Sequence, residues 1–249
     1  MITKRYHYLS IDSTNKKAKE LAEMGAAHGT LVTADAQYAG IGRRGRSWSS
    51  EKENGIYMTM ILRPEIEANK ASMLTLTAAL AVETAIANSF SCKPMIKWPN
   101  DVVLNKKKIC GILTEMVLNG TEIDYVVIGI GINVNNKEFP EEIVQTASSL
   151  ALELGEKIDR EMLITEVWNR FWVYYEQFLE TTDLSLLREK YERALVNKEE
   201  KVKVLDPLGE YTGIAKGITN TGELIVDMEG EIRQVSGGEV SVRGIYGYV

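Results

Sequence analysis

The stretch Gly40-Ile41-Gly42-Arg43-Arg44-Gly45-Arg46-Ser47-Trp48 places three glycines and three arginines directly before a tryptophan. Glycine lets a backbone approach a ligand closely or adopt a positive φ. The guanidinium group of arginine is a planar fork of donors that suits phosphate and carboxylate oxygens. The flat face of tryptophan can stack on a base. The stretch therefore predicts a flexible loop that closes over a ligand that is both anionic and aromatic, such as a nucleotide.

The same glycines match the Gly-x-Gly-x-x-Gly fingerprint of dinucleotide-binding turns. That fingerprint must lie between a strand and the start of a crossover helix. Thr30–Ala34 can form the strand, but residues 46–55 lack an apolar helical period, and Ile56–Leu62 predicts another strand. The missing helix argues against a dinucleotide-binding turn and leaves a solvated basic loop as the plain alternative to a nucleotide-closing loop.

Size and composition indicate an ordinary globular chain. Its 249 residues suit one large domain or a large domain plus a small one. Apolar residues make up 45% of the sequence, which allows a sizeable core, and the net charge of −6 argues against bulk nucleic-acid binding. The arginine cluster is therefore a local feature and not part of a basic surface.

Targeting and metal signals are also lacking in the sequence. The N-terminal residues have no apolar signal core, and Ala71–Phe90 contains Glu83, so we expect a buried helix there rather than a membrane span. Cys92 and Cys110 have no metal-type spacing, and the two histidines form no recognisable metal or triad set. Two lone cysteines fit a reduced, cytoplasmic protein without a disulfide framework.

Apolar periodicity and turn signals predict two regions: one with long helices and strands, and one with short strands separated by turns. After Asp12–Asn15, which supplies candidate N-caps, a short helix should run to Gly25. We expect strands at 30–36, 56–62, 95–98, 102–104, 109–117 and 123–134, and helices at about 70–89, 160–180 and 184–195. From Lys201 on, five short strands separated by turns predict a small barrel that docks on the larger part. The expected domains are therefore residues 1–197 and 198–249.

Two further segments have a composition suited to binding chemistry. In Lys97-Trp98-Pro99-Asn100-Asp101, a compact ammonium beside bulky residues could be held partly buried, where it would stabilise charge on a phosphate or carboxylate. A hairpin with a snorkelling lysine is the alternative. In Val127–Asn135, Gly129 and Gly131 share one strand face and would leave a flat floor for a ligand; a glycine-kinked core strand is the alternative.

Together these segments resemble the biotin protein ligases, the biotin–[acetyl-CoA-carboxylase] ligase family. The matching pieces occur in the family order over nearly the whole chain: Asp12–Asn15, Gly40–Trp48, Lys97–Asp101, Lys108–Glu115, Gly129–Asn133 and Gly237-Gly238-Glu239-Val240-Ser241-Val242-Arg243. The resemblance implies an α+β fold, in which helices flank a mixed, largely antiparallel sheet of the class II synthetase type, followed by an SH3-like β-barrel.

The resemblance also implies a two-step reaction. The biotin carboxylate attacks the α-phosphate of ATP, giving biotinyl-5′-AMP and pyrophosphate, with Mg²⁺ bound to ATP rather than to a fixed protein site. A lysine amine of a biotin carboxyl carrier domain then attacks the mixed anhydride and releases AMP. Such chemistry depends on positioning and electrostatics more than on a covalent nucleophile, which agrees with the lack of a Ser-His or Cys-His pair in the sequence.

Roles for individual residues follow from the resemblance alone. Lys97 and Arg43 would be catalytic, stabilising the anion and holding the adenylate phosphate. The implied biotin site comprises Ser13, Thr14, Asn15, Gln37, Gly40, Ile41, Gly42, Arg43, Lys97, Gly111, Gly129 and Gly131. The implied nucleotide site comprises Arg43, Arg46, Trp48, Asn133 and Arg243, with Trp48 near the adenine.

The chain departs from the family pattern at Ile41, where an arginine is frequent. If the residue at this position contributes mainly backbone, the change is tolerated; if the side chain contributes, biotin affinity or loop ordering is altered. The chain starts about a dozen residues before Ser13, which predicts a ligase-only form without an operator-binding domain. A homodimer is compatible with the resemblance.

A lipoate or octanoyl ligase, which also reacts through an adenylate but lacks the arginine-rich loop, is the closest alternative function. A non-catalytic scaffold with an SH3-like module would leave Lys97 and Gly129–Asn133 unexplained.

Overall fold

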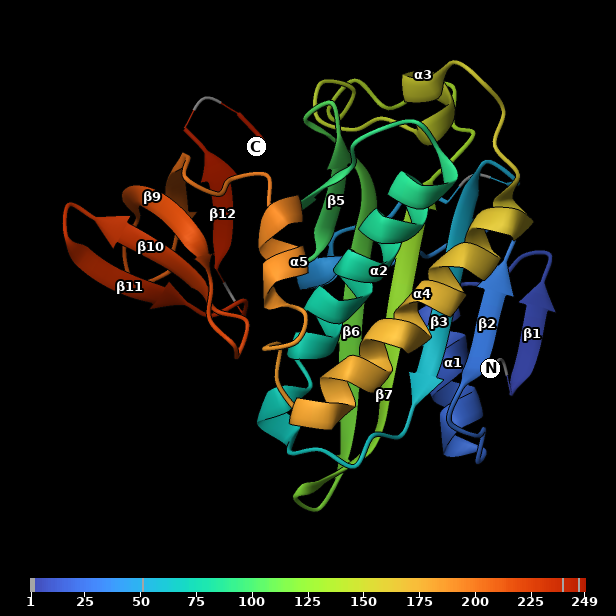
Figure 1. Cartoon of the computed structure of the whole chain (residues 1–249). Coiled ribbons are helices and arrows are strands. Elements are labelled where there is room, and N and C mark those ends of the chain that lie inside the picture. Colours follow the sequence, from blue (N-terminus) through green and yellow to red (C-terminus); the bar gives the residue numbers. More distant parts are fainter. Residues whose placement is uncertain (1–2, 51, 239, 246) are drawn as a thin grey trace.

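The computed structural model describes residues 3–50, 52–238, 240–245 and 247–249. The chain forms two sheets, one large and mixed, one smaller and antiparallel (Figure 1). The strands of the large sheet are β1 (Lys4–Tyr8), β2 (Thr30–Ala34), β3 (Gly55–Leu62), β4 (Met95–Lys97), β5 (Asp101–Leu104), β6 (Lys107–Asn119) and β7 (Glu122–Asn133). Their spatial order is β1-β2-β3-β7-β6-β5-β4, and only the β1–β2 pair is parallel. The predicted mixed, largely antiparallel sheet is confirmed.

The second sheet contains the five C-terminal strands in the order β11-β10-β9-β8-β12. They are β8 (Lys201–Leu205), β9 (Tyr211–Ile218), β10 (Leu224–Met228), β11 (Glu231–Val235) and β12 (Ser241–Gly244). The predicted strand-rich module is therefore present as an antiparallel sheet. Closure into an SH3-like barrel stays a prediction. Glu239 of the C-terminal motif lies outside the described residues.

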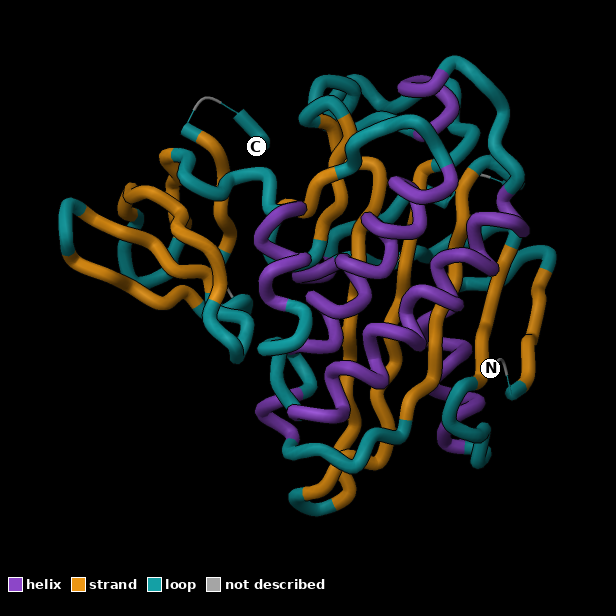
Figure 2. The backbone as a smooth tube through the Cα atoms, in the orientation of Figure 1, coloured by secondary structure: helices purple, strands orange, loops and turns teal. Residues whose placement is uncertain are grey.

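Helices lie on both faces of the large sheet (Figures 1 and 2). The helices are α1 (Thr14–Glu23), α2 (Met73–Ser89), α3 (Leu150–Leu154), α4 (Arg160–Thr181) and α5 (Arg188–Ala194), with short 3₁₀ turns at Arg43–Gly45 and Ala68–Lys70. Helices α2 and α4 cover one face, and α1 packs on the other through Ala18 and Ala22 against Val32. The expected helices are confirmed within a few residues at each end.

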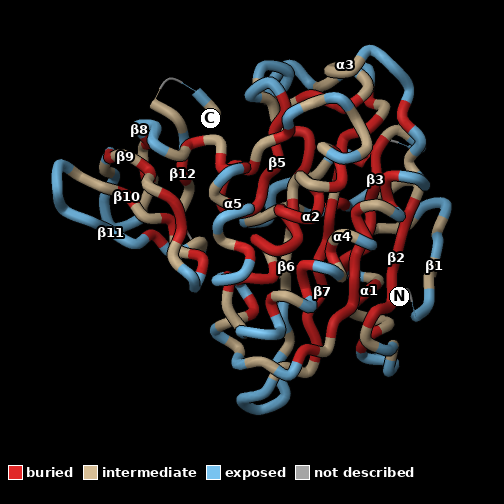
Figure 3. Tube along the Cα trace, in the orientation of Figure 1, coloured by how far each residue is buried: buried red, intermediate tan, exposed pale blue. Residues whose placement is uncertain are grey.

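Strand alternation separates the core from the opposite face of the sheet. Successive side chains of a strand point to opposite faces. Ile56, Ile132 and Cys110 lie in the large apolar cluster beneath α2, whereas their chain neighbours Tyr57 and Gly131 face the other way. Figure 3 shows that β2, β3 and β7 are buried along most of their length. The two faces of one sheet thus have different tasks: one supports the fold and the other is available for binding.

Helix α2 is apolar on every side because it is enclosed. The segment Ala68–Ser89 is long and apolar enough to cross a membrane by length and composition, but 67% of its most apolar stretch is buried inside the protein. A helix that is apolar all round fits the centre of a core. The aromatic stripe expected on the next long helix is buried too, including Phe171, Tyr175 and Phe178 of α4. Both helices act as core elements, as the sequence predicts.

The sequence did not reveal β1 or α3. The five residues of β1 are Lys-Arg-Tyr-His-Tyr, which show no apolar alternation, and none of them is buried. Pairing with β2 and polar side-chain contacts hold this edge strand in place. Helix α3 is only five residues long and begins after Ser149, whose hydroxyl accepts from the Leu152 amide at 3.3 Å. Neither element has a periodic pattern long enough to be recognised.

Candidate active site

One row of residues crosses five neighbouring strands on the face opposite to α2. Cross-strand partners follow one another as Tyr57, Gly131, Gly111, Asp101 and Lys97, from β3 through β7, β6 and β5 to β4. Residues in register across a sheet share a face. The two glycines of the row therefore lie between the bulky Tyr57 on one side and the Asp101–Lys97 pair on the other. Segments far apart in the sequence meet here.

The glycines form a floor on which two side chains rest. A Cβ at Gly131 would lie 2.6 Å from the Trp48 indole, and one at Gly111 would lie 2.9 Å from it. A Cβ at Gly129 would lie 1.9 Å from Asn15 Oδ1. No side chain larger than hydrogen fits these approaches without displacing its neighbour. The glycine spacing seen in the sequence therefore serves to seat Asn15 and Trp48 on the sheet.

A small cavity of about 50 Å³ lies above this floor. It brings together ten of the twelve residues expected around biotin: Ser13, Thr14, Asn15, Gln37, Ile41, Gly42, Arg43, Gly111, Gly129 and Gly131. Lys97 and Gly40 do not line it. A Cβ at Gly40 would lie 2.6 Å from the Trp48 carbonyl oxygen, so this glycine permits the loop to fold on itself.

Polar contacts fix the wall of the small cavity. Gln37 Oε1 accepts from the Thr14 amide at 2.7 Å and from the Thr14 hydroxyl at 3.0 Å, while Gln37 Nε2 donates to Ser50 Oγ at 2.8 Å. Asn15 Nδ2 donates to Glu115 Oε2 at 2.8 Å, and Asn15 Oδ1 accepts from Thr59 at 2.8 Å. These side chains carry the donors and acceptors that a cyclic urea requires.

A second cavity of about 300 Å³ adjoins the first. Five residues expected on the nucleotide side line it, as does Lys97: Arg43, Arg46, Trp48, Asn133 and Arg243. Arg43 and Trp48 line both cavities. Asn133 Nδ2 donates to the Ser148 carbonyl at 3.1 Å. Two compartments of different size thus share a wall made by the arginine-rich loop.

Lys97 is an unusual cation because it is buried. Its relative exposure is 8%, and burial lowers the pKa of its ammonium to about 8. The nearby Asp101 carboxylate opposes this shift, whereas the positive charge of Lys108 adds to it. The nitrogen lies 4.1 Å from the centre of the Tyr248 ring. Among the described residues it makes no ion pair, so it is available to an incoming anion.

Lys108 is a site residue that the sequence interpretation named only as the start of a motif. Its Nζ lies 2.7 Å from Asp101 Oδ1 and 5.3 Å from the centre of the Trp48 ring, and it lines both cavities. The signal was present in the sequence, because Lys108 begins the Lys108–Glu115 segment that matches the family. Tyr248 and Asn100, which also line the larger cavity, had no assigned role.

The arginine-rich loop is fastened to the C-terminal sheet region. Arg43 Nη1 donates to Asn100 Oδ1 at 2.8 Å, and Nη2 donates to the carbonyl oxygens of Gly237 and Gly238, the latter at 2.7 Å. Arg44, at φ 60°, donates to Ser241 Oγ at 3.2 Å. Burial lowers the pKa of the Arg43 guanidinium. Arg43 and Lys97 line the same cavity, so the loop lies beside the buried ammonium as the expected site requires, although Ile41 and residues 44–47 are exposed.

Comparison with known proteins identifies the class. Residues 8–133 match the biotin/lipoate A/B protein ligase family, and residues 199–243 match the biotin protein ligase C-terminal domain. The chain belongs to this ligase family.

Individual relatives narrow the class to the biotin ligases. The chain is 40% identical to the bifunctional ligase/repressor BirA of Bacillus spizizenii over 93% of this chain and 72% of the relative. It is 33% identical to the biotin–[acetyl-CoA-carboxylase] ligase of Paracoccus denitrificans over 86% and 90% of the two chains. The structure of the Aquifex aeolicus biotin protein ligase in complex with biotin and ATP superposes with a TM-score of 0.86, at 31% identity, covering 97% and 99%.

Proposed function

We propose that this protein is a biotin ligase that joins biotin to a lysine of a carrier protein at the expense of ATP, through biotinyl-5′-AMP. The observation that carries the proposal is the pair of adjoining cavities sharing Arg43 and Trp48. The smaller offers urea-type hydrogen bonding above a glycine floor, and the larger offers cations and an aromatic face. Support also comes from the Aquifex aeolicus relative, which was solved with both biotin and ATP.

The first step would be an in-line displacement at the junction of the cavities. A biotin carboxylate oxygen attacks the α-phosphorus of ATP, and the bond to the pyrophosphate oxygen breaks. Negative charge spreads over the phosphoryl oxygens in the transition state. Lys97, which is buried and has no carboxylate partner in the described part of the chain, and the guanidinium of Arg43 stabilise that charge in a water-poor site.

The second step would transfer the acyl group. A neutral lysine amine of a biotin carboxyl carrier domain attacks the anhydride carbonyl carbon, the carbon–oxygen bond to phosphate breaks, and AMP leaves while the amine loses a proton. The same cations stabilise the departing phosphate. The loop from Gly40 to Trp48 shields the adenylate from water until the carrier lysine arrives. The β11–β12 connection, which Arg43 contacts, and β12 form the other wall.

Magnesium would enter with the nucleotide. Among the described residues no group of three or more His, Cys, Asp or Glu side chains is arranged to hold a metal ion. Asp101, the carboxylate nearest to Lys97, is already paired with Lys108. Oxygen ligands for Mg²⁺ would therefore come mainly from the ATP phosphates.

The remaining assignments belong to the same proposal. The roles of the individual residues and a homodimer are inferred from the resemblance, a domain boundary at 197/198 from the strand pattern, and a cytoplasmic location from the two lone cysteines; all four stay predictions. The match of residues 199–243 to a C-terminal domain family supports the boundary. That match and the names of the two curated relatives also favour biotin over lipoate.

Exchange of labelled pyrophosphate into ATP tests the activity. We expect exchange with biotin and none with lipoate or octanoate, because adenylate formation is reversible and requires the correct acid. Transfer of labelled biotin to an isolated carrier domain tests the second step. Exchange with lipoate instead of biotin would establish the alternative ligase, and exchange with neither acid would contradict both.

A further inference from the structure

The end of the chain returns to the larger cavity. A Cβ at Gly244 would lie 2.3 Å from backbone atoms of Val249, so the absence of a side chain at Gly244 lets the last residues lie against β12. This arrangement places Tyr248 in the wall of the cavity, beside Lys97 and Arg243. The tail is thus part of the site region, although it belongs to no helix or strand.

Tyr248 completes the set of partners around one carboxylate. Its hydroxyl donates to Asp101 Oδ2. The other oxygen, Oδ1, lies 2.7 Å from Lys108 Nζ and accepts from Asn100 Nδ2 at 3.2 Å. Both oxygens of Asp101 are therefore engaged, and the carboxylate is directed toward β6 and the tail.

That engagement explains why Lys97 has no ion-pair partner among the residues that the structure describes. Lys97 and Asp101 are opposite one another in the β4–β5 register, the usual arrangement for a cross-strand ion pair. Lys97 instead packs its ammonium on the Tyr248 ring, with 4.1 Å between the nitrogen and the ring centre. A cation over an aromatic face keeps its charge and its N–H donors, because the contact uses no hydrogen-bond acceptor.

We propose that Tyr248 is a positioning residue for adenylate formation: its hydroxyl holds Asp101 away from Lys97, and its ring holds the Lys97 ammonium toward the cavity for the substrate phosphate. The inference rests on the proposed function. A carboxylate paired with Lys97 would compete with the phosphate for the cation, so an engaged Asp101 favours substrate binding in the reacting geometry.

The charges that face Lys97 come from every neighbouring element. They are Asp101 on β5, Lys108 on β6, Arg43 in the loop and Arg243 on β12, together with the Tyr248 hydroxyl in the tail. Three of these are cations that disfavour a further positive charge, and Asp101 is the single described carboxylate that counteracts them. Freeing Asp101 from Tyr248 therefore raises the pKa of Lys97.

The first experiment is biotin-dependent pyrophosphate exchange by the full-length Tyr248→Phe variant. The change removes the hydroxyl and keeps the ring. We expect kcat/KM for ATP to fall about tenfold, the effect of one lost charge-assisted hydrogen bond, with KM for biotin unchanged. Tyr248→Ala removes the ring as well and should lower exchange further. Tyr211→Phe, a change on β9 of the C-terminal sheet, is the matched control and should behave as wild type.

The second experiment measures the titration of Lys97 itself, without substrate. Lysines carrying ¹³C-methyl groups are followed by NMR against pH, and Lys97→Arg assigns the signal. We expect Tyr248→Phe to raise the pKa of Lys97 and Tyr211→Phe to leave it unchanged. An unmoved Lys97 titration in Tyr248→Phe overturns the inference, whatever the exchange rate. If the wild-type protein performs no exchange with biotin, the proposed function fails, while this titration still decides whether Tyr248 controls the Asp101–Lys97 pairing.

Discussion

Two lysines of the site have opposite electrostatic environments. Lys108 is paired with Asp101 at 2.7 Å, so its charge is largely balanced inside the protein. Lys97 is 8% exposed and has no carboxylate partner among the described residues. A buried, unpaired ammonium is costly to the folded protein and gains most from an incoming anion. Lys97 is therefore the better candidate for stabilising charge that develops during the reaction.

Replacing Lys97 by methionine should reduce biotin-dependent pyrophosphate exchange by roughly 10²–10³. Methionine keeps the length and apolar stem, so the loss reports the missing charge. Lys107→Met, a change at the start of β6 outside both cavities, is the control. Exchange within about twofold of wild type in Lys97→Met would remove this lysine from the mechanism.

The pH dependence follows from the same ammonium. Burial lowers the pKa of Lys97 to about 8, so the charged form predominates below that pH and is lost above it. We expect kcat/KM for ATP to decline as pH rises through about 8. Lys97→Arg should move that decline to a higher pH, because guanidinium stays charged. A decline at the same pH in both proteins would assign it to another group.

The residues of the site were easier to predict from the sequence than the contacts between them. The sequence brought Ser13, Gln37, Gly111 and Gly131 into one predicted site, and the structure places them around one cavity. It could not reveal that Trp48 rests on the glycine floor, because that contact joins segments about 60 to 80 residues apart whose register depends on the whole sheet.

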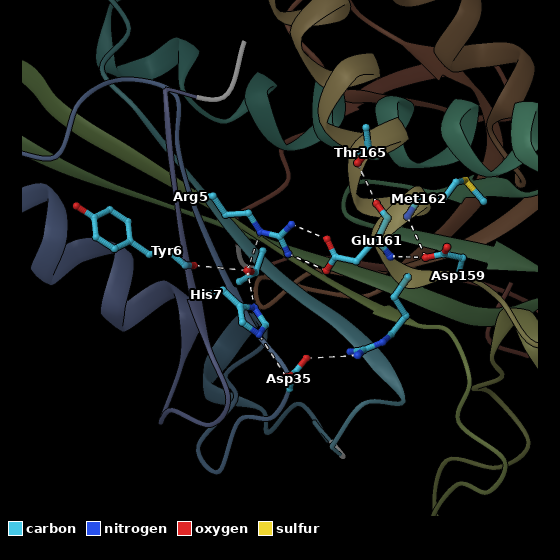
Figure 4. Close-up of polar contacts among 10 residues, drawn as sticks. Arg5, Tyr6, His7, Asp35, Asp159, Glu161, Met162 and Thr165 are labelled. Atoms are coloured by element: carbon cyan, nitrogen blue, oxygen red, sulfur yellow. Dashed lines mark hydrogen bonds and ion pairs between the residues drawn. The ribbon is translucent and has the colours of Figure 1, made fainter.

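At the scale of elements, the loop between β2 and β3 is held at both ends by α4. Arg160, the first residue of α4, donates to the Gly55 carbonyl at 3.1 Å and to Asp35 Oδ1 at 3.3 Å. Asp35 also lies 3.3 Å from His7 Nε2 of β1 (Figure 4). A second ion pair, between Arg5 and Glu161 at 2.5 Å, fastens β1 to the same helix end. One guanidinium thus joins the two stems of the arginine-rich loop.

Arg160→Met should loosen this loop without touching the cavities. We expect trypsin to cleave faster between Arg43 and Arg46, by several-fold, because the loop stems open more often. Biotin with ATP should restore part of the protection by ordering the loop. Arg193→Met, which removes an exposed ion pair on α5, serves as control. Equal cleavage rates for Arg160→Met and wild type would show that the stems of the loop do not depend on the contacts of Arg160 with Gly55 and Asp35.

The ion pair between Arg5 and Glu161 also explains why strand β1 was not predicted from the sequence. Strand β1 is polar, and besides its pairing with β2 it is held by an ion pair from Arg5 to Glu161, in a helix that begins about 150 residues later. Alternation and turn signals revealed the strands that bury an apolar face, such as β3 and β7. An edge strand held by charge carries no such local pattern.

At the scale of the whole molecule, the C-terminal sheet shares one apolar core with the large sheet and its helices, and polar contacts around α5 and the site add to this attachment. Trp98 Nε1 donates to the Gly222 carbonyl at 2.9 Å. Glu192 of α5 accepts from the Ile218 amide at 3.2 Å and pairs with Arg188 and Lys198 at 2.9 and 2.8 Å. The change to short strands near Asn197 predicted a second module. How this module packs on the larger part depends on side chains from both parts, which no local sequence pattern encodes.

Glu192→Gln should weaken this attachment measurably. Burial alone would raise the pKa of Glu192, but hydrogen bonds from Lys198, Arg188 and the Ile218 amide lower it below its usual value. A carboxyl whose pKa is lowered by folding stabilises the protein above its unfolded pKa, and this contribution is lost as pH falls through the folded pKa.

At pH 7 we expect the free energy of unfolding to fall by about 1–2 kcal/mol in Glu192→Gln. Urea titration of both proteins between pH 7 and 4 measures the difference, which should shrink toward the acid end. Glu189→Gln, an exposed change one turn earlier on α5, should cost far less, and a difference that persists undiminished at pH 4 would assign the loss to packing rather than to the carboxylate.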